Sequence, residues 1–568
     1  MSSTSRDDIV MDTSSVEKAF TDTSSPNEAE TVATTDESKY ITGIKLYLIN
    51  TCLTVSIFLV TLESTIISTA IVDITDELGG YEKSSWLFTA YMLTYCSLQM
   101  IWAKLSDIAG RKYTLIAALL IFTLFSALCG ASQTLIQLIM FRWCQGIGGC
   151  GVYALTQLLF MELVPKRKFP QYMAGVSMVL ALSLITGPLL GGGITLHGSW
   201  RWIFLLKYVS FLKELIEPTD IMISVPVGVL TAISLCFTLP RTLFNERAAQ
   251  QKHPIFSKHT LRRLDFLGAT LMLGTLVLLA TGLQQASLDY AWSSNKVLPL
   301  LVASAPFAIA FFTWQWYATQ RRTNPEPVFP WRFCQSRIQL GMIINTYLSG
   351  TVMFVCIAQI PQRYITVNGL SPLAAAVRLL TYGAFVPFGS AVAGALMGKP
   401  RIPPCWIILA GSLMEVLGIT LLAWIDTSSH IDASQYAYQI IAGTGTGLVN
   451  SGLIMLVPYA MEKRDLAVGS AATSQFRTLG GLVGIAIVTS ISTPYIRSHL
   501  TDILPLELAE SLLERTELVQ HLSPETLERV RMLFGEAYNL QVKVLIGFAV
   551  AKVPVTGLMW TNLRVESK

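Results

Sequence analysis

The feature that most constrains this chain is a succession of long apolar runs separated by short polar segments. About fourteen runs follow one another, and most approach the ~20 residues that a helix needs to cross a bilayer. Inside a bilayer, only helices and closed barrels satisfy their own backbone hydrogen bonds. The sequence therefore predicts an all-α, polytopic membrane protein. The runs are predicted at 44–72, 86–102, 113–131, 135–160, 172–193, 221–238, 266–286, 297–317, 340–360, 376–397, 404–425, 436–460, 467–493 and 542–560.

Composition excludes several other classes of protein. Hydrophobic residues make up 52% of the chain and charged residues only 14%, which is too apolar for a soluble domain. The net charge of +4 gives no sign of nucleic-acid binding. The nine cysteines form no C-x-x-C pair, and the six histidines lie in predicted loops. We therefore expect no metal site, no cofactor and no intramembrane enzyme.

Positive charge alternates among the polar segments and sets the predicted orientation. Lys and Arg gather in segments such as 103–112, 161–171 and 240–263, whereas 73–82 and 426–435 are acidic or neutral. Because excess Lys and Arg mark the cytoplasmic side, both termini are predicted to be cytoplasmic. The predicted location is the plasma membrane, and a vacuolar membrane fits the same charge pattern.

The order of the runs predicts two six-helix bundles with two additional helices between them. The first residues are rich in Ser, Thr, Asp and Glu and poor in aromatic residues, so they are expected to be disordered. The polar segment near the end is expected to be extracellular and to carry short helices. The predicted divisions are 1–43 (tail), 44–238 (first bundle), 239–265 (basic cytoplasmic loop), 266–317 (two additional helices) and 318–568 (second bundle, with the extracellular segment 495–541).

A ten-residue polar island, A-K-L-S-D-I-A-G-R-K, separates the second and third runs. It resembles the cytoplasmic loop motif G-x-L-(A/S)-D-x-x-G-R-(R/K) of the major facilitator superfamily, with Ala103 in place of the first glycine. Asp107 is expected to cap the third helix or to pair with Arg111, and Gly110 to supply the backbone freedom for a tight reversal. With Lys112, these residues form a predicted conformational gate.

The fourth run contains Arg142-Trp-Cys-Gln-Gly-Ile-Gly-Gly, which resembles the R-x-x-Q-G-x-G motif of the same superfamily. A charge at the centre of a bilayer costs ~2.5–3.5 kcal/mol even on the mildest scale. Arg142 is therefore expected to face a polar partner or water. Gln145 is a candidate for contact with substrate or proton, and the three glycines are expected to allow close helix packing.

The fifth run ends in Ile185-Thr-Gly-Pro-Leu-Leu-Gly-Gly-Gly, which resembles the antiporter motif G-P-x-x-G-G of exporters in the superfamily. Pro188 removes a helical hydrogen bond, and Gly187, Gly191 and Gly192 remove side-chain bulk. The helix is therefore expected to kink and to pack tightly where the two bundles meet.

The first run contains Leu62-Glu-Ser-Thr-Ile-Ile-Ser-Thr-Ala, which resembles the L-D-x-T-I-V-N-x-A-L-P signature of fourteen-helix drug:proton antiporters. Glu63 stands where that signature has Asp. A carboxylate inside a membrane helix is costly when ionised and cheaper when protonated, so it is suited to loading and releasing a proton. Glu415, in the eleventh run, is a second intramembrane carboxylate. It is either a substrate or proton site or a hydrogen-bonding group between helices.

An insertion separates two parts of a further family pattern. Trp200-Arg-Trp-Ile-Phe-Leu is followed only after residues 206–222 by Ile223-Ser-Val-Pro-Val-Gly, whereas the family pattern is continuous. The extra residues are either an extracellular excursion with a surface helix or a gene-model artefact such as a retained intron. The second interpretation is favoured, and sequencing of the mature transcript decides between them.

The resemblance covers residues 44–560 and implies a proton-coupled exporter of small, largely apolar organic compounds. Glu63 is the expected proton carrier, with Arg142 as its partner. The expected partners are the lipid bilayer, protons and small organic substrates, and the expected working unit is a monomer. The alternatives are a transporter of siderophores or other metabolites from the same superfamily, and a receptor or nutrient sensor on a transporter scaffold.

Overall fold

The computed structural model describes residues 43–560 with internal gaps. The larger gaps are 80–84, 165–171, 195–198, 205–226, 240–262, 288–291, 322–324, 398–401 and 506–522 apart from Leu508, and between 172 and 194 only scattered positions are described. Most of the predicted tail and the insertion 206–222 therefore lie outside the described residues.

Helices account for every regular element in the described part of the chain, apart from one isolated bridge between Leu264 and Glu326. Eleven of the described helices are long and apolar enough to cross a membrane. This confirms the predicted all-α, multi-pass membrane protein. The total of fourteen helices stays a prediction, because the fifth run is described only at scattered positions.

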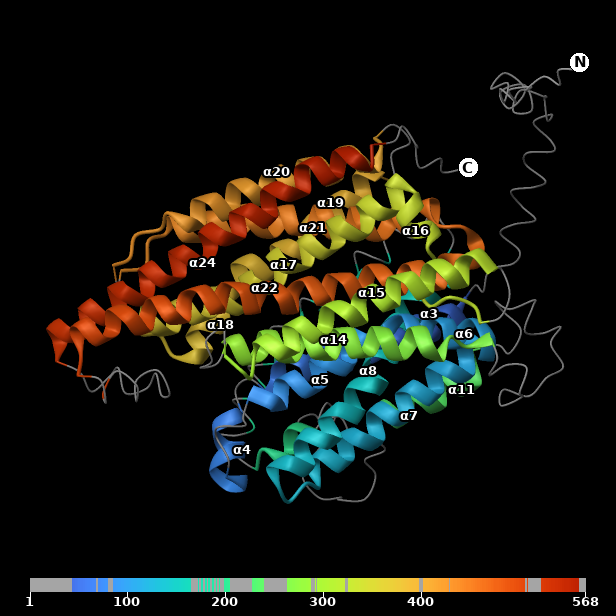
Figure 1. The fold of residues 1–568 in the computed structure, drawn as a ribbon, viewed down its shortest axis with the longest axis horizontal. Helices are drawn as coiled ribbons and strands as arrows, with labels where there is room; N and C mark the ends of the chain where they lie inside the picture. Colours follow the sequence, from blue (N-terminus) through green and yellow to red (C-terminus); the bar gives the residue numbers. More distant parts are fainter. Residues whose placement is uncertain are drawn as a thin grey trace, which may run out of the picture.

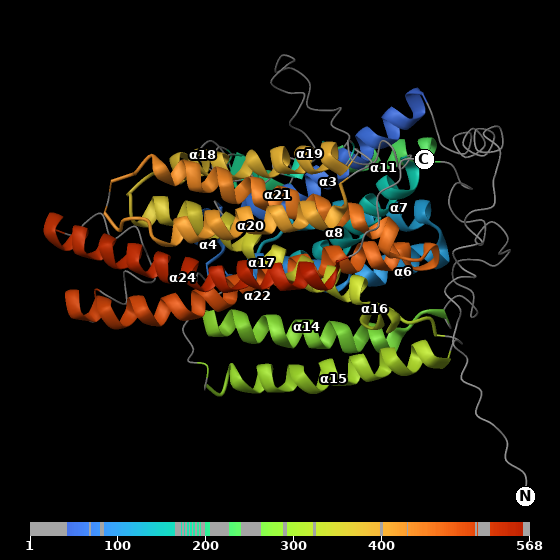
Figure 2. The ribbon, with the colours of Figure 1, turned by 90° about the horizontal axis from the view of Figure 1, so that it is seen from above.

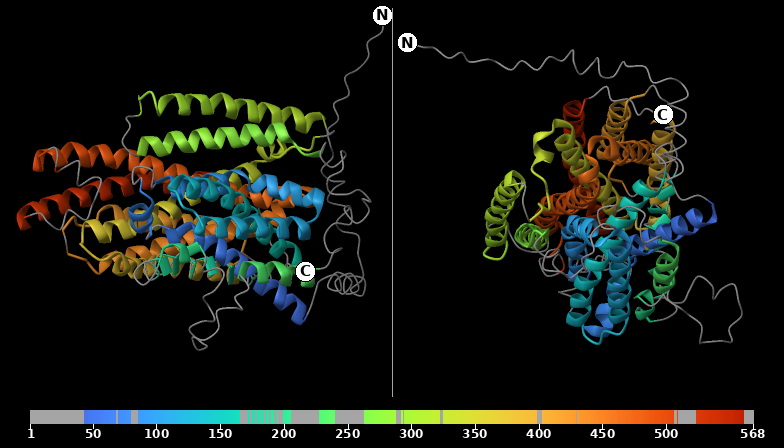
Figure 3. Two further views of the ribbon diagram at one scale, coloured as in Figure 1. Left: turned by 90° about the horizontal axis from the view of Figure 1, so that it is seen from below. Right: turned by 90° about the vertical axis from the view of Figure 1, so that its right-hand side faces the viewer.

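The first group of helices contains Glu63, Arg142 and the polar island, and it forms the blue and teal body in Figure 1. Figure 3, which views the molecule end-on in its right panel, shows this group beside a second, yellow to red group. The helices of the first group are α3 (Ile44–Ile66), the short α4 (Ile71–Leu78), α5 (Ser85–Ser97), α6 (Gln99–Ala109), α7 (Arg111–Gly130), α8 (Leu135–Leu163) and α11 (Val227–Thr238).

The second group contains Glu415 and the last predicted runs. Serine caps begin two of its helices, because Ser371 accepts a hydrogen bond from the Ala374 amide and Ser523 accepts one from the Thr526 amide. In both, proline follows the cap at the first helical position, where its missing N–H costs nothing. The helices are α16 (Arg332–Gln335), α17 (Arg337–Thr366), α18 (Pro372–Gly383), α19 (Phe385–Met397), α20 (Pro404–Ala423), α21 (Ser434–Ala460), α22 (Leu466–Ile503) and α24 (Pro524–Leu558).

The two additional helices, α14 (Phe266–Ser287) and α15 (Leu298–Arg321), form a hairpin beside α22, with α15 outermost (Figure 2). The buried carboxylate of Asp265 fastens this hairpin. It accepts hydrogen bonds from the Gly268 amide at 2.7 Å, from Trp314 Nε1 at 2.7 Å and from Gln315 Nε2 at 2.8 Å. One side chain thus caps α14 and joins it to α15.

Helices α22 and α24 are much longer than a bilayer is thick. With 38 and 35 residues, they span ~57 and ~52 Å at ~1.5 Å per residue, against a hydrocarbon core of ~30 Å. Their ends project at one side of the molecule (Figure 1) and pack through Leu500, Leu504, Val530 and Leu533. Within the segment 495–541, which was expected to carry short helices, most of the described residues belong to extensions of these two helices.

Candidate functional site

The structure brings Glu63 of α3 and Arg142 of α8 together as an ion pair. Neither side chain is exposed to solvent. Arg142 also donates from Nη1 to Gln145 Oε1 at 3.0 Å and from Nε to the Leu87 carbonyl at 3.1 Å. Its guanidinium group lies 4.5 Å from the centre of the Tyr91 ring. Three residues singled out from two motifs on different helices, Glu63 from the first run and Arg142 and Gln145 from the fourth, thus form one polar cluster inside an apolar bundle.

Glycines in the fourth run allow this cluster to assemble. A Cβ atom on Gly146 would lie 2.5 Å from the Tyr91 carbonyl oxygen, and one on Gly149 would lie 2.6 Å from the Tyr91 hydroxyl. On the other side of α8, a Cβ on Gly148 would lie 2.4 Å from the Phe122 amide nitrogen. Such contacts are too short for any side chain. The close helix packing predicted for these glycines is confirmed, and it holds α8 against both α5 and α7.

A central cavity lies between the two groups of helices, one turn from Glu63. Val60 and Thr61 of α3 line it, and it holds about 1110 Å³ of space free of protein atoms, including the part that opens to solvent. Most of the lining is apolar or aromatic. The lining residues are Val60, Thr61, Met92, Tyr95, Tyr153, Leu180, Met353, Phe354, Ile357, Leu379, Tyr382, Gly383, Val386, Ser390, Asn450, Ile454, Arg477 and Thr478.

Arg477 of α22 is the charged residue among these lining residues. Its Nη2 donates a hydrogen bond to the Tyr153 hydroxyl of α8, so it joins the two bundles. Arg477 lies in the middle of an apolar run, yet no role was predicted for it. The signal that singled out Arg142, a cation at membrane depth, applies equally to Arg477.

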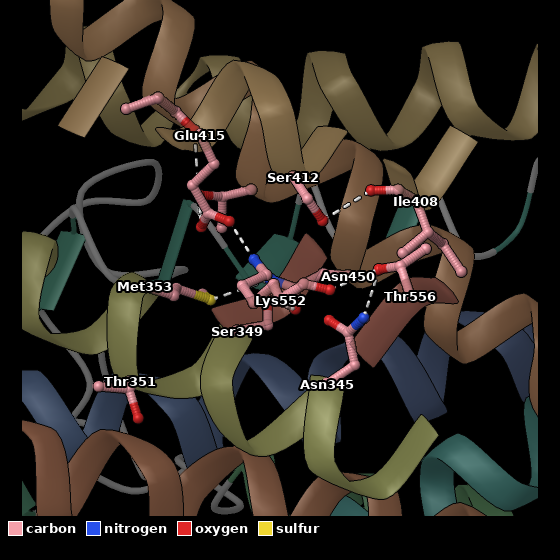
Figure 4. A network of polar contacts seen from close by, with 12 residues as sticks. Asn345, Ser349, Thr351, Met353, Ile408, Ser412, Glu415, Asn450, Lys552 and Thr556 are labelled. Atoms are coloured by element: carbon pink, nitrogen blue, oxygen red, sulfur yellow. Dashed lines mark hydrogen bonds and ion pairs between the residues drawn. The ribbon is translucent and has the colours of Figure 1, made fainter. Parts of the chain in front are cut away.

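A second buried ion pair lies in the other bundle. Glu415 of α20 pairs with Lys552 of α24, and neither side chain is exposed. Figure 4 shows the pair within a polar network between α17, α20, α21 and α24. The second oxygen, Glu415 Oε1, accepts a hydrogen bond from the Thr446 hydroxyl at 2.9 Å. No role was predicted for Lys552 from the sequence, although it too is a cation well inside a predicted membrane run.

A short series of hydroxyl groups connects this second pair with the cavity. The Tyr382 hydroxyl lies 3.1 Å from the Thr446 hydroxyl, which in turn contacts Glu415, and Tyr382 lines the cavity. Asn450 also lines the cavity and accepts a hydrogen bond from Ser349 at 2.9 Å (Figure 4). The two buried carboxylates are therefore each near the cavity, in opposite bundles.

Comparisons with known proteins agree with this arrangement. Residues 53–212 match the family described as Major Facilitator Superfamily. The MFS-type transporter FPY5 of Fusarium mangiferae is 34% identical over 519 residues, which cover 91% of this chain and 84% of the relative. This chain belongs to the major facilitator superfamily. It is a membrane transporter and not an enzyme.

Further similarities extend over nearly the whole length of this chain. The rubrofusarin-specific efflux pump aurT of Gibberella zeae is 26% identical over 565 residues, covering 97% of this chain and 98% of the relative. A solved bacterial homologue of the human lysosomal transporter Spinster, in an inward-facing and unoccupied conformation, aligns with a TM-score of 0.54 at 13% identity. That alignment covers 92% of this facilitator and 100% of the bacterial protein, so the fold is shared along nearly its full length.

The polar island of this facilitator folds as a charged turn. Gly110 ends α6 with a φ of +95°, a conformation that side chains rarely adopt, as expected for the tight reversal. Asp107 pairs with Arg111 at 2.6 Å rather than capping the next helix, and Arg111 also pairs with Glu162 of α8 at 3.0 Å. Lys112 donates to the carbonyl oxygens of residues 236 and 239, at the end of α11.

The same island contacts the polypeptide on both sides of the additional hairpin. Lys104 pairs with Glu326, which follows α15, at 2.5 Å. Glu326 also pairs with Arg263, which precedes α14, at 2.8 Å. Burial alone would raise the pKa of Glu326, but the nearby Lys104 and Arg263 outweigh it, and the pKa lies below its usual value. This three-residue cluster fastens both ends of the hairpin to α6.

The antiporter motif is described only in part. Gly187 and Gly191 are buried and helical, whereas Pro188 and Gly192 lie outside the described residues. Ser183, one turn before the motif, donates a hydrogen bond to the Thr61 hydroxyl at 2.6 Å. The fifth helix thus contacts α3 at the cavity, two residues from Glu63.

Proposed function

We propose that this transporter exports small, largely apolar organic compounds in exchange for protons. Two properties of the molecule support the proposal. The first is the mostly apolar and aromatic cavity between the bundles, which suits such substrates. The second is the name of aurT, which describes that relative as an efflux pump. A siderophore transporter, the alternative transport function, would carry a bulky polar iron chelate and would need a more polar cavity than this one.

The buried pair of Glu63 and Arg142 carries the proposal of proton coupling. When Glu63 is ionised, the pair is neutral and the two charges hold α3 against α8. Protonation of the Glu63 carboxylate removes its charge and leaves Arg142 with its bonds to Leu87 and Gln145. The two protonation states thus differ in how strongly α3 is held, one turn from the cavity. Such a difference biases the rocking of the bundles, which exposes the cavity to one side and then the other.

The available free energy is sufficient for one proton per cycle. A proton that moves inward gains ~2.3 kcal/mol per 100 mV, and each pH unit adds ~1.4 kcal/mol. At ~100 mV, a single proton sustains a gradient of a neutral substrate of about fiftyfold. One coupling carboxylate is therefore enough to drive export. We propose the pair of Glu415 and Lys552 as a second, additional site, which protons reach through the hydroxyl groups of Tyr382 and Thr446.

Proteoliposomes with an acid lumen test the proposal. Molecules that insert inside-out should take up an aromatic probe as protons leave the lumen. The probes are neutral Nile red and the permanent anion 1-pyrenesulfonate, so the assay tests both an uncharged and a negatively charged aromatic substrate. The wild-type chain should accumulate at least one of them only when the pH gradient is present.

The variant Glu63→Gln should lose this gradient-driven uptake, because its side chain carries no exchangeable proton. It should still exchange probe for probe across the membrane, and Glu63→Asp should retain part of the coupling. Undiminished gradient-driven uptake by Glu63→Gln would contradict the coupling role. If neither probe responds to the gradient in the wild-type chain, the proposed function itself fails.

A further inference from the structure

The cavity contains a cation that no described carboxylate neutralises. Arg142 and Lys552, two other buried cations of the membrane helices, each form an ion pair with a glutamate. Arg477 forms none within 4.0 Å in the part of the chain that the structure describes, although it is 91% buried, with a relative exposure of 9%. All other lining residues are uncharged. The wall of the cavity is therefore positive at one point and apolar over most of its area.

The backbone holds Arg477 in this position. A Cβ atom on Gly350 of α17 would lie 1.9 Å from the Arg477 carbonyl oxygen, and one on Gly480 would lie 2.0 Å from the Tyr347 carbonyl oxygen. The Thr351 hydroxyl donates to the Gly480 carbonyl at 2.9 Å. Because α17 and α22 touch backbone to backbone here, α22 cannot rotate to remove the charge from the cavity. In this conformation, Arg477 is therefore held in a largely desolvated position, which is costly for a charged group.

The guanidinium group of Arg477 determines which chemical group of a bound molecule would offset this cost. Arginine has five N–H donors in a planar fork that matches carboxylate and similar oxyanions. In the structure, one of the donors is directed to the Tyr153 hydroxyl. The aromatic rings of Tyr95, Tyr153 and Tyr382 also line the cavity and offer flat apolar surface.

We infer that the cavity selects organic anions: molecules with an apolar, aromatic body and one acidic group that pairs with Arg477. This inference rests on the proposed function and adds to it the charge class of the substrate. It also changes the driving force. Export of an anion moves negative charge outward, so a potential of ~100 mV contributes about another fiftyfold to the gradient.

The test compares two probes with the same aromatic body and different charge. The full-length protein in detergent is titrated with 1-pyrenesulfonate, a permanent anion, and with neutral 1-pyrenemethanol, and binding is followed by fluorescence anisotropy. The wild-type chain should bind the anion at least about tenfold more tightly, the effect expected of a hydrogen bond to a charged group. Equal affinity for the two probes would overturn the inference, and this comparison needs no variant.

Variants then assign the preference to Arg477. Arg477→Gln should bring the two affinities close together, and Arg477→Lys should retain most of the preference because it retains the charge. Arg321→Gln, which removes an exposed arginine at the end of α15, is the matched control and should leave the preference unchanged. A preference that persists in Arg477→Gln overturns the inference. Failure of the proposed function would be seen separately in the proteoliposome assay, because the wild-type chain would then show no gradient-driven uptake of either Nile red or 1-pyrenesulfonate.

Discussion

The pair of Glu415 and Lys552 gives the sharpest test of the energetics of this fold. Replacement of Lys552 by Met removes one charge and leaves the Glu415 carboxylate buried with Thr446 as its remaining described partner. Both side chains have 0% exposure, so water cannot replace the lost partner. Breaking a buried ion pair in this way typically costs about 3–5 kcal/mol. We therefore expect Lys552→Met to be strongly destabilised.

The double variant Glu415→Gln/Lys552→Met removes both charges together. Because replacement of a whole buried pair by uncharged groups is often close to neutral, most of the loss should be recovered. Thermal unfolding of the purified chain in detergent measures the four members of this double-mutant cycle. The free energy of coupling between the two positions should be at least ~2 kcal/mol.

An exposed ion pair on the same helix provides the matched control. Arg529 and Glu525 lie four residues apart on α24 and form a pair at 2.9 Å, with side-chain exposures of 62% and 81%. Pairs of this kind contribute about 0.2–1 kcal/mol, so Arg529→Met should change stability little. If Lys552→Met is as stable as Arg529→Met, or if the double variant is no more stable than Lys552→Met, the reasoning about desolvation is refuted.

Two other predictions concern packing and pH. Gly480→Ala places a Cβ atom 2.0 Å from a backbone oxygen of α17 and should cost about 1–3 kcal/mol, whereas Gly547→Ala, with no atom within 4 Å, should be nearly neutral in the same thermal assay. The pKa of Glu326 is depressed in the folded protein, so its stabilising effect is present above the unfolded value of ~4.3 and is lost as the pH falls through the folded-state pKa. The difference in melting temperature between the wild-type chain and Glu326→Gln should therefore be clear at pH 7 and shrink below pH ~4.

Each of these two predictions has a result that would contradict it. Equal melting temperatures for Gly480→Ala and Gly547→Ala would show that α17 and α22 separate easily. A difference between the wild-type chain and Glu326→Gln that stays constant from pH 7 to pH ~3.5 would show that the ion pairs of Glu326 with Lys104 and Arg263 contribute nothing to stability.

Much of the fold follows from the sequence alone, because membrane insertion is a local property. A run of about 20 apolar residues forms a helix in lipid whatever its neighbours do. For the same reason, Glu63, Arg142 and Glu415 could be identified as functional candidates, since a charge at membrane depth is costly in any context. The turn at Gly110 was predictable too, because its left-handed backbone depends on only a few residues.

The tertiary structure decided which of these charges meet. Glu415 and Lys552 are 137 positions apart, and Arg477 and Tyr153 are 324 apart. Membrane helices are apolar on almost every side, so their sequence does not show which face is turned to lipid and which to the interior. That choice depends on glycine contacts between helices, such as those of Gly480. The sequence therefore determined the helices and the costly residues, whereas packing alone decided that two cations are paired and that a third faces the cavity.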